Sequence, residues 1–283
     1  MIALVILTLA GTLPDRGIFP ELLARVNLEA PRSVDPAQAW LRLDRAHGLA
    51  TLYEGDHPLA LYPLVGGRLG DGDRATLQAL GATARVRQGA PPRSEDRDGD
   101  GIVDRLDVLL GAKKLLYNGA RYLERYVAID YPNGDVPRTE GVCSDTVIRA
   151  LRNAGLDLQR EVHEDILRAP RAYPMVEKVD ASINHRRVRT LLPWFVRHWQ
   201  TLPRGARARP GDVVFFDTFP AREGPDHLGV VSDRVGAGGQ PLVINNWTDG
   251  ATDAEMDLLS WVPVTHHFRW PSTSARGGRS QAR

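Results

Sequence analysis

The sequence has one cysteine and three methionines, and it has almost no excess of either charge. A single cysteine excludes an intrachain disulfide and any metal site built from several thiolates. A net charge of +1 over 283 residues gives no global field that would attract nucleic acid or an anionic membrane surface. No apolar run is long enough to span a bilayer. The composition, 42% hydrophobic and 25% charged, is that of a globular chain with a sizeable core.

The two ends of the chain differ in composition from the rest. Residues 1–12 begin with a short apolar run that ends in small residues, as in a signal peptide, although no basic residue precedes the run. We therefore expect a signal segment and export to the periplasm or cell envelope, and the alternative is a buried N-terminal strand. Residues 272–283 are polar and basic, and we expect a disordered tail.

Residues 13–94 are expected to form an N-terminal extension. Patchy apolar spacing predicts a helix over residues 19–43. Two short apolar runs around Glu54, Gly55, Asp56 and His57 predict a β-hairpin over residues 50–62. The Gly-rich and Arg-rich stretch over residues 66–94 is expected to be a loop with little core.

Residues 96–107 match the spacing of a twelve-residue calcium loop of the EF-hand kind. The ligands would be five carboxylates at positions one, three, five, nine and twelve and a backbone carbonyl at position seven: Asp96, Asp98, Asp100, Asp104, Asp107 and Ile102. Gly101 stands at position six, where such a loop turns sharply. Position twelve carries an aspartate where a glutamate usually binds with both oxygens, so weak affinity is expected. The alternative is a solvated acidic turn.

A helix is expected directly after this loop, because apolar residues recur every three to four positions from Leu106 to about Arg125. Residues 95–126 would then form a calcium-loop-and-helix unit. Bound Ca²⁺ would fix the start of the helix and have a structural part, and no cofactor is expected for catalysis.

The only cysteine, Cys143, precedes an apolar helix in which Val147, Ile148 and Leu151 share one face and which Gly155 ends. A thiol at a helix N-terminus is a candidate nucleophile, because the unpaired N–H groups and the helix dipole favour a thiolate. The alternative is that Cys143 is a small buried hydrophobic residue.

A base for this thiol is available downstream. His227 opens an apolar strand, and the next apolar strand ends in Asn245 and Asn246. Cysteine, histidine and amide together are one arrangement of a nucleophile, its base and the group that orients the base. His185 and Arg186 lie in a basic cluster that would suit a substrate carboxylate, and the alternative is a surface salt-bridge cluster.

Helices followed by sequential strands, with little alternation of strand and helix, predict an α+β fold with an antiparallel sheet. The strands are expected around residues 213–216, 227–231, 242–245 and 264–270. A nucleophile helix packed on this sheet would make residues 127–271 one domain.

Several of these stretches resemble a known family. Residues 210–216, with their Pro-Gly-Asp turn, and residues 227–231 resemble the second half of NlpC-type cell-wall cysteine peptidases of the papain-like superfamily. Tyr131 precedes Cys143 much as a family tyrosine precedes its nucleophile. Tyr131-Pro132, Gly141-Val142-Cys143, residues 162–165 and residues 184–187 are more closely similar to a bacterial domain-of-unknown-function family, number 1287, related to these peptidases.

The resemblance implies a papain-like or NlpC-like core with Cys143 as nucleophile, His227 as base and Asn245 as the third residue. Asn246 is the alternative third residue on the opposite face of the strand. Tyr131 would line the nucleophile's side of the cleft and so contact substrate. The chain departs from the pattern in the longer interval between cysteine and histidine, in Val142 where an aspartate is usual and in an amide at the third position.

The resemblance implies a thiol hydrolase, a peptidase or amidase, that acts on peptide amide bonds of the cell wall through an acyl-thioester. The partner would be a peptide or peptidoglycan substrate, with no nucleic acid and no stable membrane span. Two alternatives stay open: an acyltransferase or transpeptidase with the same nucleophile, and a non-catalytic, calcium-stabilised binding module on a degenerate peptidase fold.

Overall fold

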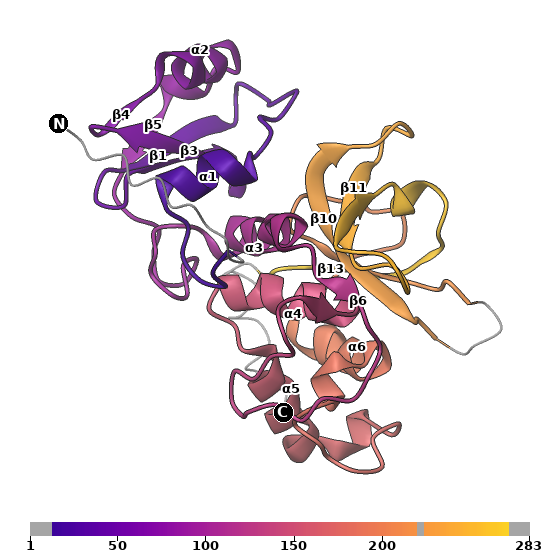
Figure 1. The fold of residues 1–283 in the computed structure, drawn as a ribbon. Coiled ribbons are helices and arrows are strands. Elements are labelled where there is room, and N and C mark those ends of the chain that lie inside the picture. Colours follow the sequence, from indigo (N-terminus) through magenta and orange to yellow (C-terminus); the bar gives the residue numbers. More distant parts are fainter. Residues whose placement is uncertain (1–12, 220–223, 272–283) are drawn as a thin grey trace, which may run out of the picture.

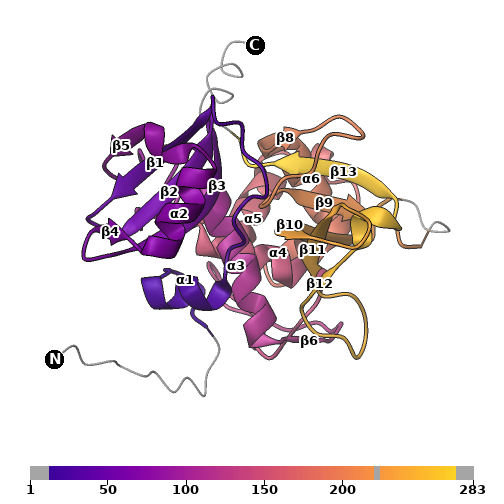
Figure 2. The ribbon, with the colours of Figure 1, turned by 90° about the horizontal axis from the view of Figure 1, so that it is seen from above.

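The computed structural model describes residues 13–219 and 224–271. The expected signal segment and the expected disordered tail lie outside the described residues. Two sheets lie on opposite sides of the helices α3 (Asp104–Asn118) and α4 (Cys143–Asn153), as Figures 1 and 2 show. The first sheet has the strand order β4-β3-β2-β1-β5, the second has the order β12-β11-β10-β9-β13-β8, and a short pair joins β6 and β7. The fold is therefore mixed α+β, as the sequence predicted.

The first sheet is built from residues 39–88. Its strands are β1 (Ala39–Asp44), β2 (Leu49–Glu54), β3 (His57–Val65), β4 (Arg68–Leu69) and β5 (Val86–Gln88), with α2 (Asp71–Ala79) and the 3-10 turn η1 (Ala82–Ala84) packed on it. The expected hairpin is present, since β2 and β3 pair antiparallel through a turn at Gly55, whose φ is 58°. One face of the sheet packs on α2, and the other joins the main core.

Two predictions for the N-terminal region are wrong. Residues 19–43 contain only a short helix, α1 (Pro20–Val26), and then β1. Pro31 and Pro36 interrupt the helical pattern, because proline lacks an N–H group and disfavours helix in the residue before it. The stretch over residues 66–94 is also more ordered than a loop, since it contains β4, α2, η1 and β5.

The helix α3 (Asp104–Asn118) lies at the centre of the molecule, between the two sheets (Figure 2). All its residues from Asp104 to Leu115 are buried, which is expected for a helix enclosed on every side. It ends at Gly119 in the left-handed conformation, earlier than the predicted Arg125, because this glycine caps the helix. A Cβ on Gly111 would meet Asn153 Cβ at 2.6 Å, so α3 and α4 approach closely.

The second half of the chain supplies a helical layer and the second sheet. The helices are α4 (Cys143–Asn153), α5 (Leu158–Arg168) and α6 (Val188–His198), with the 3-10 turns η2 (Pro170–Ala172), η3 (Asn184–Arg186) and η4 (Leu258–Ser260). The strands are β6 (Arg121–Tyr122), β7 (Glu140–Gly141), β8 (Gln200–Thr201), β9 (Val213–Phe216), β10 (His227–Val235), β11 (Pro241–Asn245), β12 (Ala254–Met256) and β13 (Val264–Arg269). β9, β10 and β11 pair antiparallel, so the end of β11 lies beside the start of β10. In the described part of the chain, no helix combines the length and apolar character needed to cross a bilayer.

Candidate active site

Cys143 is the first residue of α4, so the predicted helix N-terminus is present. The carboxylate of Asp145 accepts a hydrogen bond from the N–H of Val142 at 2.8 Å and closes the first turn. The thiol is buried, with 5% of Cys143 exposed. Burial raises the pKa of this thiol to about 12, and the charge of Asp145 acts in the same direction. Burial therefore opposes the thiolate that the helix N-terminus is expected to favour, because a buried thiolate loses its hydration.

The sulfur of Cys143 lies beside the start of β10. The backbone N–H groups of Leu228 and Ser144 lie close enough to the sulfur to lower the thiol pKa, though by less than burial raises it. Leu228 directly follows His227, so the nucleophile helix and the histidine strand meet at this point. The cysteine and the beginning of the histidine strand, 84 residues apart in the numbering, are thus brought together by the fold.

The imidazole of His227 is oriented by an amide. Its Nε2 lies 3.0 Å from Oδ1 of Asn245, and the amide Nδ2 donates to the carbonyl of Val243 at 3.1 Å. Because the amide oxygen can only accept, Nε2 carries a proton and Nδ1 is the free basic nitrogen of the neutral ring. Burial lowers the pKa of His227 to about 4, and the hydrogen bond with Asn245 acts against this shift.

Asn246 does not contact the imidazole through a hydrogen bond and instead anchors the end of β11. Its Nδ2 donates to the carbonyl of Ala120 at 2.9 Å, which ties the end of β11 to the residue before β6. The two neighbouring asparagines point to opposite sides of the strand, as strand geometry requires. The residue that the structure brings to the imidazole is Asn245.

Sequence reasoning missed two aromatic residues at this site. The ring of Trp247 stands edge-on to His227, with 4.7 Å between ring centroids, and next to it lies Trp261, at 5.4 Å from Trp247. Trp247 therefore covers the imidazole and excludes water from it. Burial raises the pKa of Tyr122, on β6, to about 12. The position of Trp247, two residues after Asn245, is the sequence signal that was available.

Of the three residues expected to bind substrate, Tyr131 packs on another side chain, and Arg186 and His185 are buried. Tyr131 is 44% exposed and packs its ring on His163, with 4.9 Å between centroids. Arg186 is buried and forms an ion pair with Asp145, at 2.7 Å between Nε and Oδ1. His185 is also buried, and burial lowers its pKa to about 3. The alternative of a surface salt-bridge cluster is wrong, because His185 and Arg186 are buried, and the expected role of Tyr131, His185 and Arg186 in substrate binding stays a prediction.

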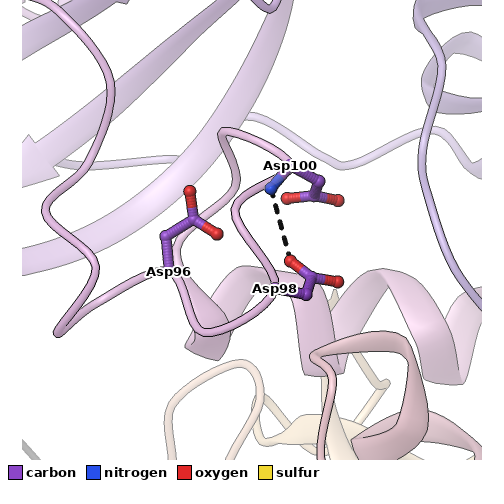
Figure 3. A group of neighbouring side chains, drawn as sticks. All are labelled: Asp96, Asp98 and Asp100. Atoms are coloured by element: carbon purple, nitrogen blue, oxygen red, sulfur yellow. Dashed lines mark hydrogen bonds between the residues drawn. The ribbon is translucent and has the colours of Figure 1, made fainter.

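The acidic loop before α3 gathers its first three carboxylates. Asp96, Asp98 and Asp100 each offer an oxygen, and these oxygens lie within 4.8 Å of one another (Figure 3). The carboxylate of Asp96 accepts from the N–H groups of Gly99 and Gly101, at 2.6 and 3.1 Å. Asp100 accepts from the N–H of Ile102 at 2.9 Å, so the loop folds around its own carboxylates.

The other predicted carboxylate ligands, Asp104 and Asp107, differ in their hydrogen-bond partners. Asp107 is fully buried, with Oδ1 bound to the amide of Asn153 and Oδ2 without a hydrogen-bond partner among the described residues. Its pKa is raised by burial and by the nearby charges of Asp100 and Asp98. Asp104 accepts from the N–H of Arg97 at 2.7 Å, and Asp100 Oδ2 is a second buried oxygen without a partner among the described residues. Buried, mutually repelling carboxylates with free oxygens fit a hard cation such as Ca²⁺.

Comparisons with known proteins place the chain in a family. Residues 109–270 match the model of a family described as Domain of unknown function (DUF1287). An uncharacterised protein of Escherichia coli strain K12, YijF, is 40% identical over 163 residues, which cover 56% of this chain and 78% of that protein.

A solved structure, that of NlpC2 from Trichomonas vaginalis, is 16% identical, with 79% of this chain and 57% of that one covered. The chain thus spans little more than half the length of that protein, and the TM-score between the two structures is 0.35. The family match covers more than half of this chain and includes Cys143, His227 and Asn245, which confirms the resemblance to family 1287. The chain belongs to the DUF1287 family.

Proposed function

We propose that the protein is a thiol hydrolase that cleaves amide bonds of cell-wall peptides. One observation carries this proposal: the His227–Asn245 hydrogen bond lies at the strand end against which the sulfur of Cys143 packs. A nucleophile, a neutral imidazole and an amide that fixes the tautomer are the parts that an acyl transfer to sulfur requires. The cell-wall substrate rests on the sequence resemblance to NlpC-type peptidases.

The proposed reaction starts from a protonated thiol and a neutral imidazole. Nδ1 of His227 takes the thiol proton as the sulfur attacks the carbonyl carbon, and the imidazolium then gives this proton to the leaving amine. Water then gives a proton to the same nitrogen and attacks the acyl-thioester; the carbon–sulfur bond breaks, the acid is released, and the imidazolium returns the proton to the thiolate. The N–H group of Cys143, at the start of α4, would donate to the oxyanion, because a helix N-terminus leaves such groups unpaired within the helix.

The test is digestion of purified peptidoglycan peptides, followed by mass spectrometry of the products. We expect cleavage by the wild type and none by Cys143→Ser or His227→Ala. An added amine separates hydrolysis from the alternative acyl transfer, because a transferase would give the amide of that amine. Cleavage that survives in Cys143→Ser would refute the proposal.

The alternative of a non-catalytic binding module keeps one observation in its favour. Cys143 is buried and its pKa is raised to about 12, which is the state of an inert structural cysteine more than of a reactive thiol. This alternative predicts that the protein binds cell-wall peptides without cleaving them and that Cys143→Ser binds them equally well. Co-sedimentation of both proteins with insoluble peptidoglycan measures that binding.

We also propose that the acidic loop binds Ca²⁺ as a structural ion. Asp96, Asp98 and Asp100 would supply side-chain oxygens, and the free Oδ2 of Asp107 would supply one from the first turn of α3. The ion would neutralise buried carboxylates beside the central helix and so stabilise the fold. Export to the cell envelope, where Ca²⁺ is available, belongs to the same proposal, and secretion of a tagged full-length chain tests it.

A further inference from the structure

Three arginines from three segments gather around one carboxylate at the start of β9. Arg105 belongs to the first turn of α3, Arg209 to the turn before β9, and Arg269 to the end of β13. Arg269 holds Asp212 through Nε and Nη2, at 2.8 and 2.7 Å, and Nε2 of His267 lies 2.9 Å from the same carboxylate. The charge of Asp212 also acts to raise the pKa of Arg105 and, together with Glu54, that of Arg209, so one carboxylate already held by Arg269 and His267 is shared among three guanidinium groups.

Arg105 is the most enclosed of these arginines, with 8% of its surface exposed. Its Nε donates to the carbonyl of Pro210 at 3.2 Å, and among the described residues no carboxylate lies within ion-pair distance of its guanidinium. Burial lowers the pKa of Arg105 to about 10; the charge of Asp212 opposes this shift, and the charges of Arg269 and Arg209 add to it. The side chain thus carries a buried positive charge beside two others.

Arg209 and His57 complete the cluster. Nη1 of Arg209 is buried and has no hydrogen-bond partner in the described part of the chain. His57 opens β3 of the first sheet, and its pKa is lowered by burial and by the charges of Arg209, Arg105 and Arg269. His57 therefore lies within electrostatic reach of the three arginines, and the groups come from both sheets, since β3 belongs to the first and β9 and β13 to the second.

Three guanidinium groups that share a single carboxylate leave an excess of buried positive charge, which opposes folding because its lost hydration is only partly replaced. The simplest compensating group is an anion supplied from outside the chain. We propose that Arg105, Arg209 and His57 bind an oxyanion group, phosphate or carboxylate, at the junction of the two sheets. The guanidinium fork matches both kinds of oxyanion and donates two parallel hydrogen bonds to either.

This site is separate from the candidate active site. Phe216, at the far end of β9, pairs with His227, whereas Gly211 and Asp212 at the near end are hydrogen-bonded to Val231. Four residues of strand separate the two ends, which is about 13 Å. The oxyanion site would therefore anchor a ligand and take no part in the thiol chemistry, and it goes beyond the proposed hydrolase.

The experiment compares the full-length wild type with two variants in sodium phosphate, acetate and chloride of equal ionic strength. Arg105→Met removes the buried charge and keeps most of the apolar stem. Arg68→Met, on exposed β4, removes one positive charge from a surface position and is the matched control. Melting temperature and isothermal titration calorimetry with phosphate or acetate are the two readouts.

We expect phosphate or acetate, at about ten times its dissociation constant, to raise the melting temperature of the wild type and Arg68→Met by about 2–4 °C. Arg105→Met should show neither this rise nor the heat of binding. The anion that acts distinguishes a phosphate ligand from a carboxylate one. Equal shifts in all three proteins, or the absence of binding heat in the wild type, would overturn the proposal. If Arg105→Met does not fold, Arg209→Gln, at a half-buried position, gives the same comparison.

Discussion

Arg186 and Asp145 form a buried, two-point ion pair behind the candidate nucleophile. Nε and Nη2 of Arg186 lie 2.7 and 2.9 Å from the two carboxylate oxygens of Asp145. Asp145 also accepts the N–H of Val142, and the hydroxyl of Ser144 donates to the carbonyl of Arg186 at 2.6 Å. The 3-10 turn that carries Arg186 therefore holds the first turn of α4, and with it the backbone of Cys143, in place.

Replacement of Arg186 by methionine should destabilise the protein by about 3–5 kcal/mol, because Asp145 would remain as an unpaired buried charge. Arg187→Met, at the exposed neighbouring position, should change stability by less than about 0.5 kcal/mol. Urea unfolding of both variants measures the difference. The double variant Arg186→Met with Asp145→Asn should recover part of the loss. Equal stability of Arg186→Met and wild type would show that the ion pair is not structural.

The two neighbouring asparagines separate orientation of the base from strand anchoring. Asn245→Ala should lower kcat on a cleaved peptide by about 10- to 100-fold, because His227 would lose the amide that fixes its proton on Nε2. Asn246→Ala removes the hydrogen bond to Ala120 and should lower the melting temperature more than kcat. Steady-state kinetics and thermal melts on the same preparations distinguish the two. A larger kcat loss in Asn246→Ala would reverse the assignment.

Sequence patterns predict the turns and strands whose formation depends on neighbouring residues. The hairpin at Gly55 was readable, because a turn between two apolar runs needs few distant contacts. The strands after Asp212 were readable for the same reason. Residues 19–43 were misread, because the apolar spacing of Trp40 and Leu41 suits a helix or a strand, and only packing against the rest of the sheet decides between them.

The sequence predicts the candidate catalytic residues, but it does not predict how deeply they are buried or which side chains surround them. Residue types and order give Cys143 and His227 as candidates and leave Asn245 and Asn246 open, and only the family resemblance favours Asn245. The raised pKa of the thiol could not be predicted, because it depends on how deeply distant segments bury Cys143. The ion pair between Arg186 and Asp145 could not be predicted for the same reason, since 41 residues separate them in sequence.

Alkylation of Cys143 should be slow at neutral pH. Burial raises the thiol pKa to about 12, so at pH 7 the thiolate fraction is far below that of a free cysteine with a pKa of about 8.5. We expect the rate with iodoacetamide to be at least about 100-fold below that of free cysteine at pH 7 and to rise up to pH 10. Fast alkylation at pH 6 that disappears in His227→Ala would instead show a thiolate–imidazolium pair in the resting protein.

Removal of Ca²⁺ should lower the melting temperature. Without the ion, Asp98, Asp100 and Asp107 would remain as clustered carboxylates whose pKa values are raised by burial. A site with a dissociation constant one hundredth of the Ca²⁺ concentration would contribute about 2.7 kcal/mol, or roughly 5–10 °C for a chain of this size. Differential scanning fluorimetry in Ca²⁺ and in chelator measures this shift.

The matched variants for that measurement are Asp100→Asn and Asp56→Asn. Asp100→Asn removes a predicted ligand and should abolish the effect of Ca²⁺ on the melting temperature. Asp56→Asn changes the same charge at an exposed hairpin position and should keep that effect. If wild type melts at the same temperature with and without chelator, the structural-calcium proposal is wrong.

Asp253 should make the protein less stable as the pH rises. Its Oδ1 accepts the hydroxyl of Thr146 at 2.7 Å, and its Oδ2 is buried without a partner among the described residues. Burial raises the folded-state pKa to about 6, above the unfolded value of about 3.9. The folded state therefore holds the proton more tightly, so the stabilising contribution is present below pH 4 and is lost as the pH rises through 6.

Asp253→Asn should keep the bond to Thr146 and remove this pH dependence. At pH 7.5 the variant should be more stable than wild type by about 2 kcal/mol, and at pH 4 the two should be nearly equal. Asp249→Asn, on the same loop but exposed, should follow the wild-type curve. Urea unfolding of the three proteins between pH 4 and pH 8 gives the comparison. An Asp253→Asn variant that is less stable than wild type at pH 7.5 would mean that the ionised carboxylate has a partner that stabilises it.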